Sequence, residues 1–147
     1  MSGTDPLVKP MLAIAATLLE QGDRLDQLSR ILTVGGLIGL VGSGVVGLQT
    51  GLLSGAMALA GLVELYFAFR VALDAVLFRQ LARDGADWQS FDGAMTRLGL
   101  LPPAKAGRSA EARIAGALRL LRCQAVALAV QVALVVMLAL CEIWLRR

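Results

Sequence analysis

The chain has 147 residues, a formal net charge of +3 and no histidine, and 57% of its residues are hydrophobic. Soluble domains are about 45–50% apolar, so this fraction favours a membrane protein over a soluble domain. The lack of histidine removes the commonest metal and haem ligand. The sequence also has no phosphate-binding loop and no nucleophile motif. We therefore expect a single domain with no catalytic residue, no metal, no cofactor and no nucleic acid partner.

Residues 10–30 are predicted to form an amphipathic helix, with charged residues opposite an apolar face. Gly22 followed by Asp23 favours a break within it. Acidic and basic residues cancel here, which argues against strong electrostatic anchoring to lipid. Two interpretations stay open: the helix lies at the membrane interface or on its own protein, or it forms a coiled coil with a partner. The apolar face contains Met11, Ile14, Leu18, Leu25, Leu28 and Leu32, with Gln21 as its polar member.

An uncharged stretch follows, from residue 31 to residue 63. As one helix it would be roughly 50 Å long, whereas the bilayer core is about 30 Å thick. Two transmembrane spans joined by a tight turn are therefore predicted, over residues 31–48 and 56–78. Turn-forming residues between Gln49 and Gly55 place the hairpin there.

Small residues recur every four positions in the first span, at Gly35, Gly39, Ser43 and Gly47. Such a row lets helix backbones approach closely in lipid, where water cannot drive association. The row is predicted to be a helix-packing face. It serves either a tight hairpin within one chain, or self-association and docking onto a larger membrane protein.

The second span contains three charged residues, Glu64, Arg70 and Asp74. A charge at the centre of a transmembrane helix costs about 2.5–3.5 kcal/mol, so each needs a partner or a role. Arg70 and Asp74 are four residues apart and are predicted to pair. Glu64 has no convenient partner on its own helix, so we expect it either to have a polar partner on another helix or to be protonated, because burial disfavours its charged form.

The segment from residue 84 to residue 115 is polar and is predicted to be a cytoplasmic loop with a short amphipathic helix. Asp87 is a candidate cap for this helix, and Ser109 for the long helix that follows. The third span is predicted at residues 122–143, with Gln124 and Gln131 on one face. We expect Gln131 to take part in a buried contact with Arg70 and Asp74 of the second span. The surface for cytoplasmic docking comprises Trp88, Phe91, Met95 and Leu98.

Charge asymmetry predicts the orientation. Eight lysine and arginine residues lie between Arg79 and Arg122, whereas the predicted hairpin turn has no charge. By the positive-inside rule the N-terminus is cytoplasmic and the C-terminus is outside. Many arginines beside few lysines, with abundant alanine, leucine and glycine, favour the bacterial inner membrane as the location.

These patterns predict an all-α integral membrane protein, with an amphipathic N-terminal helix, a helical hairpin and a third span. The favoured function is non-catalytic: a small subunit, scaffold or adaptor of a larger membrane assembly. The alternative is an ion- or proton-coupled transport component that uses Glu64 within the membrane. In both cases the expected partners are the lipid bilayer and either further copies of the chain or a larger membrane protein.

Overall fold

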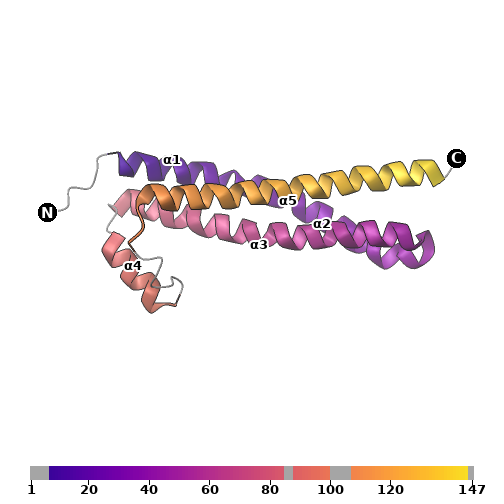
Figure 1. Ribbon diagram of the computed structural model, residues 1–147, viewed down its shortest axis with the longest axis horizontal. Coiled ribbons are helices and arrows are strands. Elements are labelled where there is room, and N and C mark those ends of the chain that lie inside the picture. The colour runs from indigo at the N-terminus through magenta and orange to yellow at the C-terminus, as the bar shows by residue number, and fades with distance from the viewer. Residues whose placement is uncertain (1–6, 85–87, 100–106, 146–147) are drawn as a thin grey trace.

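The computed structural model describes residues 7–84, 88–99 and 107–145, leaving aside the side chains of residues 43–46, 84, 89 and 145. These residues form helices and no strands, which confirms the predicted all-helical class. Three long helical segments lie side by side, and a short helix lies at one end of the bundle (Figure 1). The helices are α1 (Val8–Glu20), α2 (Gly22–Val46), α3 (Leu48–Asp84), α4 (Trp88–Arg97) and α5 (Ala110–Leu145).

Helices α1 and α2 follow one another with a break at Gln21. The Gln21 N–H donates to the Leu18 carbonyl, and the Arg24 N–H donates to the Gln21 carbonyl, at 3.2 Å each. These bonds span three residues instead of four and so tighten the helix at this point. The break lies beside the predicted Gly22–Asp23 position. In Figure 1, α1 and α2 together cross the bundle obliquely, from the upper edge at the α4 end to the lower edge at the hairpin.

The chain reverses at Gly47, which has a φ of +117°. Glycine tolerates this conformation because it has no Cβ, so a single residue joins α2 to α3. The predicted turn at Gln49–Gly55 is therefore wrong. Gln49 and Thr50 lie in the first turn of α3 and reach α5 instead: Gln49 donates to Cys141 Sγ at 3.6 Å and Thr50 donates to Glu142 at 3.1 Å.

The polar segment contains α4, close to the helix that its sequence predicts. Trp88 and Phe91 are half-buried and pack against the apolar core of the long helices. Asp87, the predicted cap of α4, lies outside the described residues. Ser109 caps α5 as predicted, because its hydroxyl accepts a hydrogen bond from the Ala112 N–H at 3.3 Å.

The core of the bundle changes in character along its axis. At the end that carries α4 it is apolar, and further along it becomes polar. The apolar cluster joins α1 to α3 and α5, and comprises Leu12, Ala15, Ala16, Leu19, Val71, Ala75, Phe78, Leu81 and Ala117. The small alanines allow α1 to lie close against its neighbours, since close contact is the main attraction between packed side chains.

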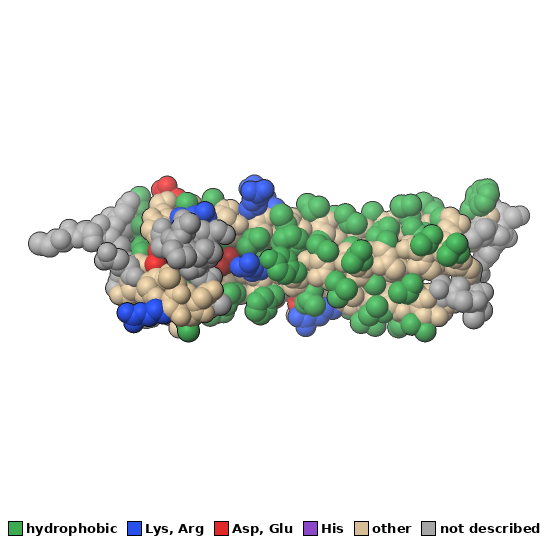
Figure 2. All heavy atoms as spheres, turned by 60° about the horizontal axis from the view of Figure 1, so that its bottom comes forward, with side chains coloured by type: hydrophobic (Ala, Val, Ile, Leu, Met, Phe, Trp, Pro, Cys, Tyr) green, Lys and Arg blue, Asp and Glu red, His purple; other side chains and the backbone are tan. Residues whose placement is uncertain are grey.

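Three helical segments are long and apolar enough to span a membrane: Val8–Gly42, Leu48–Arg83 and Ala110–Trp144. The first combines the predicted amphipathic helix with the first predicted span. On the face drawn in Figure 2, acidic and basic side chains gather toward the end that carries α4, and the face nearer the hairpin is hydrophobic.

Candidate functional site

The first polar layer of the core is formed by Glu64 of α3, Gln124 of α5 and Gly22 of α2. Glu64 and Gln124 are both fully buried. The Gln124 amide nitrogen donates to Glu64 Oε1 at 2.8 Å and to the Gly22 carbonyl at 2.9 Å. Glu64 therefore has its polar partner on another helix. Among the described residues, Glu64 Oε2 and Gln124 Oε1 have no hydrogen-bond partner.

The second polar layer centres on Gln131 of α5, which is also fully buried. Ser29 donates its hydroxyl hydrogen to Gln131 Oε1 at 2.6 Å. The Gln131 amide nitrogen donates to Thr33 Oγ1 at 3.1 Å and to the Met57 carbonyl at 3.4 Å. Thr33 in turn donates to the Ser29 carbonyl at 2.7 Å. One glutamine thus joins all three long helices.

The two layers repeat at the same interval on every helix. Seven residues separate Gly22 from Ser29 on α2 and Gln124 from Gln131 on α5, and Met57 lies seven residues before Glu64 on α3. A seven-residue repeat is typical of left-handed bundles, where equivalent positions return to the same seam. Shifting one helix along its axis would break both layers, so the polar core fixes the register.

Glycines allow the helices to approach at these layers. A Cβ on Gly22 would lie 2.9 Å from Gln124 Oε1, and a Cβ on Gly36 would lie 2.9 Å from the Ser54 carbonyl. Gly61 is the tightest of these positions, because a Cβ there would lie 2.6 Å from Gln131 Nε2 and 2.8 Å from Thr33 Cβ. These three positions did not belong to the small-residue row that the sequence singled out.

The predicted row has several different environments. A Cβ on Gly39 would lie 2.5 Å from Ser54 Oγ, so Gly39 lies at a helix contact. A Cβ on Gly35 would meet nothing within 4 Å, and Gly47 forms the turn. The side chain of Ser43 lies outside the described residues. Among the glycines of α2, Gly36 and Gly39 approach α3 most closely, and Gly35 is exposed.

The predicted contact of Arg70 with Gln131 is wrong. Arg70 is exposed, donates to Tyr66 Oη at 3.4 Å and lies 5.8 Å from the centre of the Tyr66 ring. Gln131 lies level with Met57, about 20 Å along α3 from Arg70. Asp74 is half-buried nearer the α4 end. The charge of Arg70 acts on Asp74, one helical turn away, as the predicted pairing requires, whereas Glu64 lies in a different environment.

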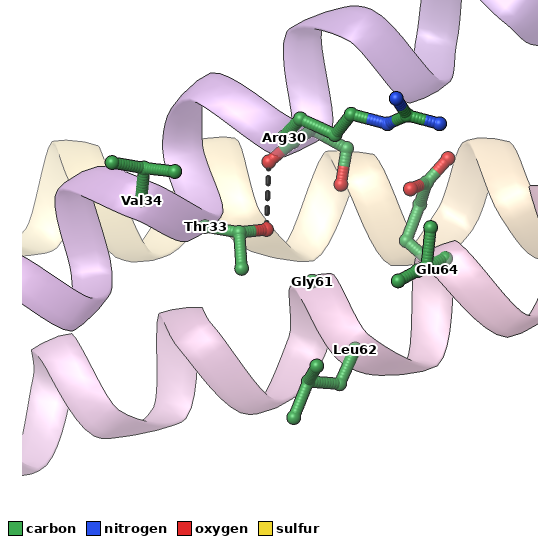
Figure 3. A pocket seen from close by; sticks show the side chains of 8 residues that line it. Arg30, Thr33, Val34, Gly61, Leu62 and Glu64 are labelled. Carbon is green, nitrogen blue, oxygen red and sulfur yellow. Dashed lines mark hydrogen bonds between the residues drawn. The ribbon is translucent and has the colours of Figure 1, made fainter.

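A groove of about 220 Å³ between α2 and α3 leads to the first polar layer. Figure 3 shows the Glu64 carboxylate pointing from α3 toward the side of α2 that carries Arg30. The hydroxyl-bearing residues Ser29 and Thr33 line the same groove. The remaining lining residues are Val34, Gly61, Leu62 and Leu65.

One face of α2 is charged at the level of the polar layers. Asp23, Arg24 and Arg30 are exposed, and Gln27 is exposed beside them. Arg30 forms an ion pair with the buried Asp26 at 2.5 Å. At this same level α3 and α5 expose apolar side chains: Leu59 is 63% exposed, Leu62 58%, Val126 63% and Val130 47%. At this level the exposed charged side chains are therefore concentrated on α2, beside the apolar Leu28 and Ile31, whereas those exposed on α3 and α5 are mostly apolar, with Arg70 of α3 as an exception.

The docking surface predicted on α4 is partly used within the chain. Trp88 and Phe91 pack against the core, Met95 is half-buried, and Leu98 is 69% exposed. Sequence analysis missed the ion pair that holds α4 against α5. Arg113 Nη2 lies 2.8 Å from the buried Asp92 carboxylate, and the guanidinium lies 4.9 Å from the centre of the Trp88 ring. No spacing rule connects residues 92 and 113, which lie on different helices and come together only in the folded chain.

The residues that the structure describes contain no cluster of metal ligands. Comparison of the chain with known proteins finds no matching family model, no matching curated protein and no matching solved structure. Its function has to be inferred from its own geometry.

Proposed function

We propose that this chain is a small, non-catalytic integral membrane subunit, scaffold or adaptor of a larger membrane assembly. The observation that supports it is the charged face of α2, at the level where the side chains exposed on α3 and α5 are mostly apolar. This face is formed by Asp23, Arg24, Gln27 and Arg30. Charged side chains at bilayer depth face protein or a water-filled cavity, because lipid does not solvate them.

The depth of this face follows from contacts with α5. Gln124 bonds to Gly22 and Gln131 bonds to Ser29, so the charged face lies beside residues 124–131 of α5. Those residues belong to an uncharged run of α5, residues 123–141, which is about 28 Å long and matches a bilayer core of about 30 Å. A membrane that covers this run also covers the charged face. A polar surface on a second protein would cover it better than lipid.

The same proposal includes an orientation and a location. The lysine and arginine residues between α3 and the apolar part of α5 favour a cytoplasmic α4, a cytoplasmic N-terminus and an external C-terminus. The arginine-rich composition favours the bacterial inner membrane. In this arrangement the exposed parts of α4 and of α1 are accessible from the cytoplasm.

The test is a double variant, Asp23→Asn with Arg24→Gln, which neutralises two exposed residues of opposite sign and leaves the net charge unchanged. We expect the assembly to weaken more than tenfold, because losing a charged contact at an interface costs about 2–5 kcal/mol. The measurement is the native mass and composition of the complex extracted in mild detergent.

The matched control is Glu111→Gln with Arg119→Gln, which removes two exposed charges of opposite sign from α5, outside the charged face, and also leaves the net charge unchanged. It should leave the assembly intact. A wild-type chain that migrates as a single 15.5 kDa protomer in every mild detergent would contradict the proposal. So would a double variant that retains the full complex.

A second candidate function is ion- or proton-coupled transport through Glu64. It is favoured by the groove between α2 and α3, which leads to a buried carboxylate with one oxygen lacking a partner among the described residues. Buried acidic groups within membrane helices commonly mark ion or proton pathways. The hydroxyl groups of Ser29 and Thr33 lie along the same groove.

Glu64→Gln separates the two functions, because it keeps the size of the side chain and removes its charge. We expect the variant to assemble as the wild type does, and reconstituted liposomes to show no Glu64-dependent ion flux. Arg70→Gln, which neutralises an exposed charge on the same helix, is the control. Flux in the wild type and in Arg70→Gln that disappears in Glu64→Gln would overturn the non-catalytic proposal.

A further inference from the structure

The first helical segment carries two apolar rows that lie one residue apart. The inner row, which includes Leu12, Ala15 and Leu19, is buried in the bundle. The outer row, Met11, Ile14 and Leu18, has the same alternation of three and four residues. Ile14 is 62% exposed and Leu18 is 47% exposed. Alternating spacings of three and four are what a coiled-coil seam requires, and the bundle uses only one of the two seams.

The outer row lies beyond the proposed membrane layer. Helix α1 packs against Val71, Ala75 and Phe78 of α3, on the α4 side of the polar layers. It runs alongside α3 and α5 and is about 20 Å long (Figure 1). If the bundle crosses the membrane as proposed, α1 extends along the membrane normal, away from lipid. Its outer row then faces water or protein, and water disfavours an exposed apolar face.

This face of α1 carries both a ridge and a hollow. A hollow of about 280 Å³ lies on α1, lined by Ala13, Ile14, Thr17 and Leu18. Ile14 and Leu18 form a ridge with four-residue spacing, and the small residues Ala13 and Thr17 form the groove beside it. A ridge and a groove side by side on one patch are what a twofold contact between identical surfaces needs.

We propose that the outer row of α1 binds the outer row of a second copy of this chain, with the two α1 helices parallel. Two copies inserted in the same orientation present this face at the same height above the membrane, so the ridges and grooves are in register. No charged residue lies between Pro10 and Leu19, so like charges do not meet when the face pairs with itself. Gln21, exposed at the end of the row, lies opposite its own copy, where two amides can each donate and accept.

This proposal rests on the membrane insertion that the proposed function includes. The test places opposite charges at position 14 in two variants, which are examined separately and then mixed. Ile14→Glu should dissociate the dimer, because two carboxylates would meet in an apolar seam. Ile14→Lys should do the same. Mixing the two variants should restore a dimer, since position 14 then pairs opposite charges. The measurement is mass in detergent by light scattering, with Val76→Glu, an exposed apolar position on α3, as the control that stays dimeric.

Crosslinking checks the geometry in liposomes. In a background with Cys123→Ala and Cys141→Ala, Ile14→Cys should give a crosslinked dimer with a short bifunctional maleimide, and Ala115→Cys on the exposed face of α5 should not. A monomeric wild type, or no recovery on mixing the two charged variants, would overturn the parallel dimer.

Resistance of the membrane-bound chain to alkaline extraction is measured separately. A chain that resists extraction but is monomeric refutes this inference alone, and a chain that is extracted refutes membrane insertion itself.

Discussion

Replacing Gly61 by alanine should destabilise the bundle strongly. The added methyl group would lie 2.6 Å from Gln131 Nε2 and 2.8 Å from Thr33 Cβ, closer than side-chain carbons approach other atoms. Overpacking of this kind typically costs about 1–3 kcal/mol. The cost here should reach the upper end, because Thr33 and Gln131 are hydrogen-bonded and cannot turn aside without losing those bonds. The measurement is the unfolding midpoint in a fixed detergent.

Gly35→Ala is the matched control for Gly61→Ala. It makes the same chemical change in α2, where the new methyl group would meet nothing within 4 Å. In a helix, alanine is favoured over glycine by roughly 0.5–1 kcal/mol, so the control should be neutral or slightly more stable. Equal destabilisation by both changes would mean that the close approach at Gly61 does not exist.

The long helices and the start of α5 were accessible from the sequence, because these signals are local. The long uncharged run of α5 marks the helix itself. Ser109, just before its first residue, marks where it begins, because serine hydroxyls commonly cap the N-terminus of a helix. The short helix with Trp88 and Phe91 was likewise predicted from its own spacing. Signals within one turn of helix do not depend on how the helices later pack.

The position of the hairpin was less accessible. Several polar and small residues between Gln49 and Gly55 are typical of a turn. Gly47 is a single turn-forming residue, so the sequence favours the later position. The structure uses Gly47 and keeps Gln49 and Thr50 helical, because their side chains find partners on α5. Moving the turn lengthens the outer part of α3, and it changes which residues face each other at each level. That displacement explains why Glu64, and not Arg70, lies near a glutamine of α5.

The packing glycines could not be chosen from a four-residue spacing alone. Gly35 and Gly36 are neighbours about 100° apart on the helix, and only the rotation of α2 decides which one faces α3. That rotation is set by the seven-residue repeat of the polar layers, in which Gly22 and Ser29 precede Gly36. The partners of this row lie on α3 and α5, so no window of sequence around α2 contains them.

Gln131→Met should reveal how much the second polar layer contributes to stability. Methionine has a similar length but leaves the buried Ser29 hydroxyl without its acceptor, and it breaks the bonds to Thr33 and to the Met57 carbonyl. Hydrogen bonds between membrane helices average about 0.6 kcal/mol, with a maximum near 1.7. A loss of about 2 kcal/mol in the free energy of unfolding is therefore expected for the set.

A double-mutant cycle with Ser29→Ala isolates the shortest hydrogen bond of this layer. Each single change should destabilise the bundle, one by leaving a hydroxyl without an acceptor and the other by leaving an amide oxygen without a donor. The double variant removes both groups, so neither is left without a partner. Its loss in the free energy of unfolding should therefore be about 1 kcal/mol smaller than the sum of the two single losses. Val130→Met, on the exposed face of α5, should change the stability little. Strict additivity would show that Ser29 and Gln131 are not coupled. The seven-residue repeat would then not be what holds α2 in register with α5.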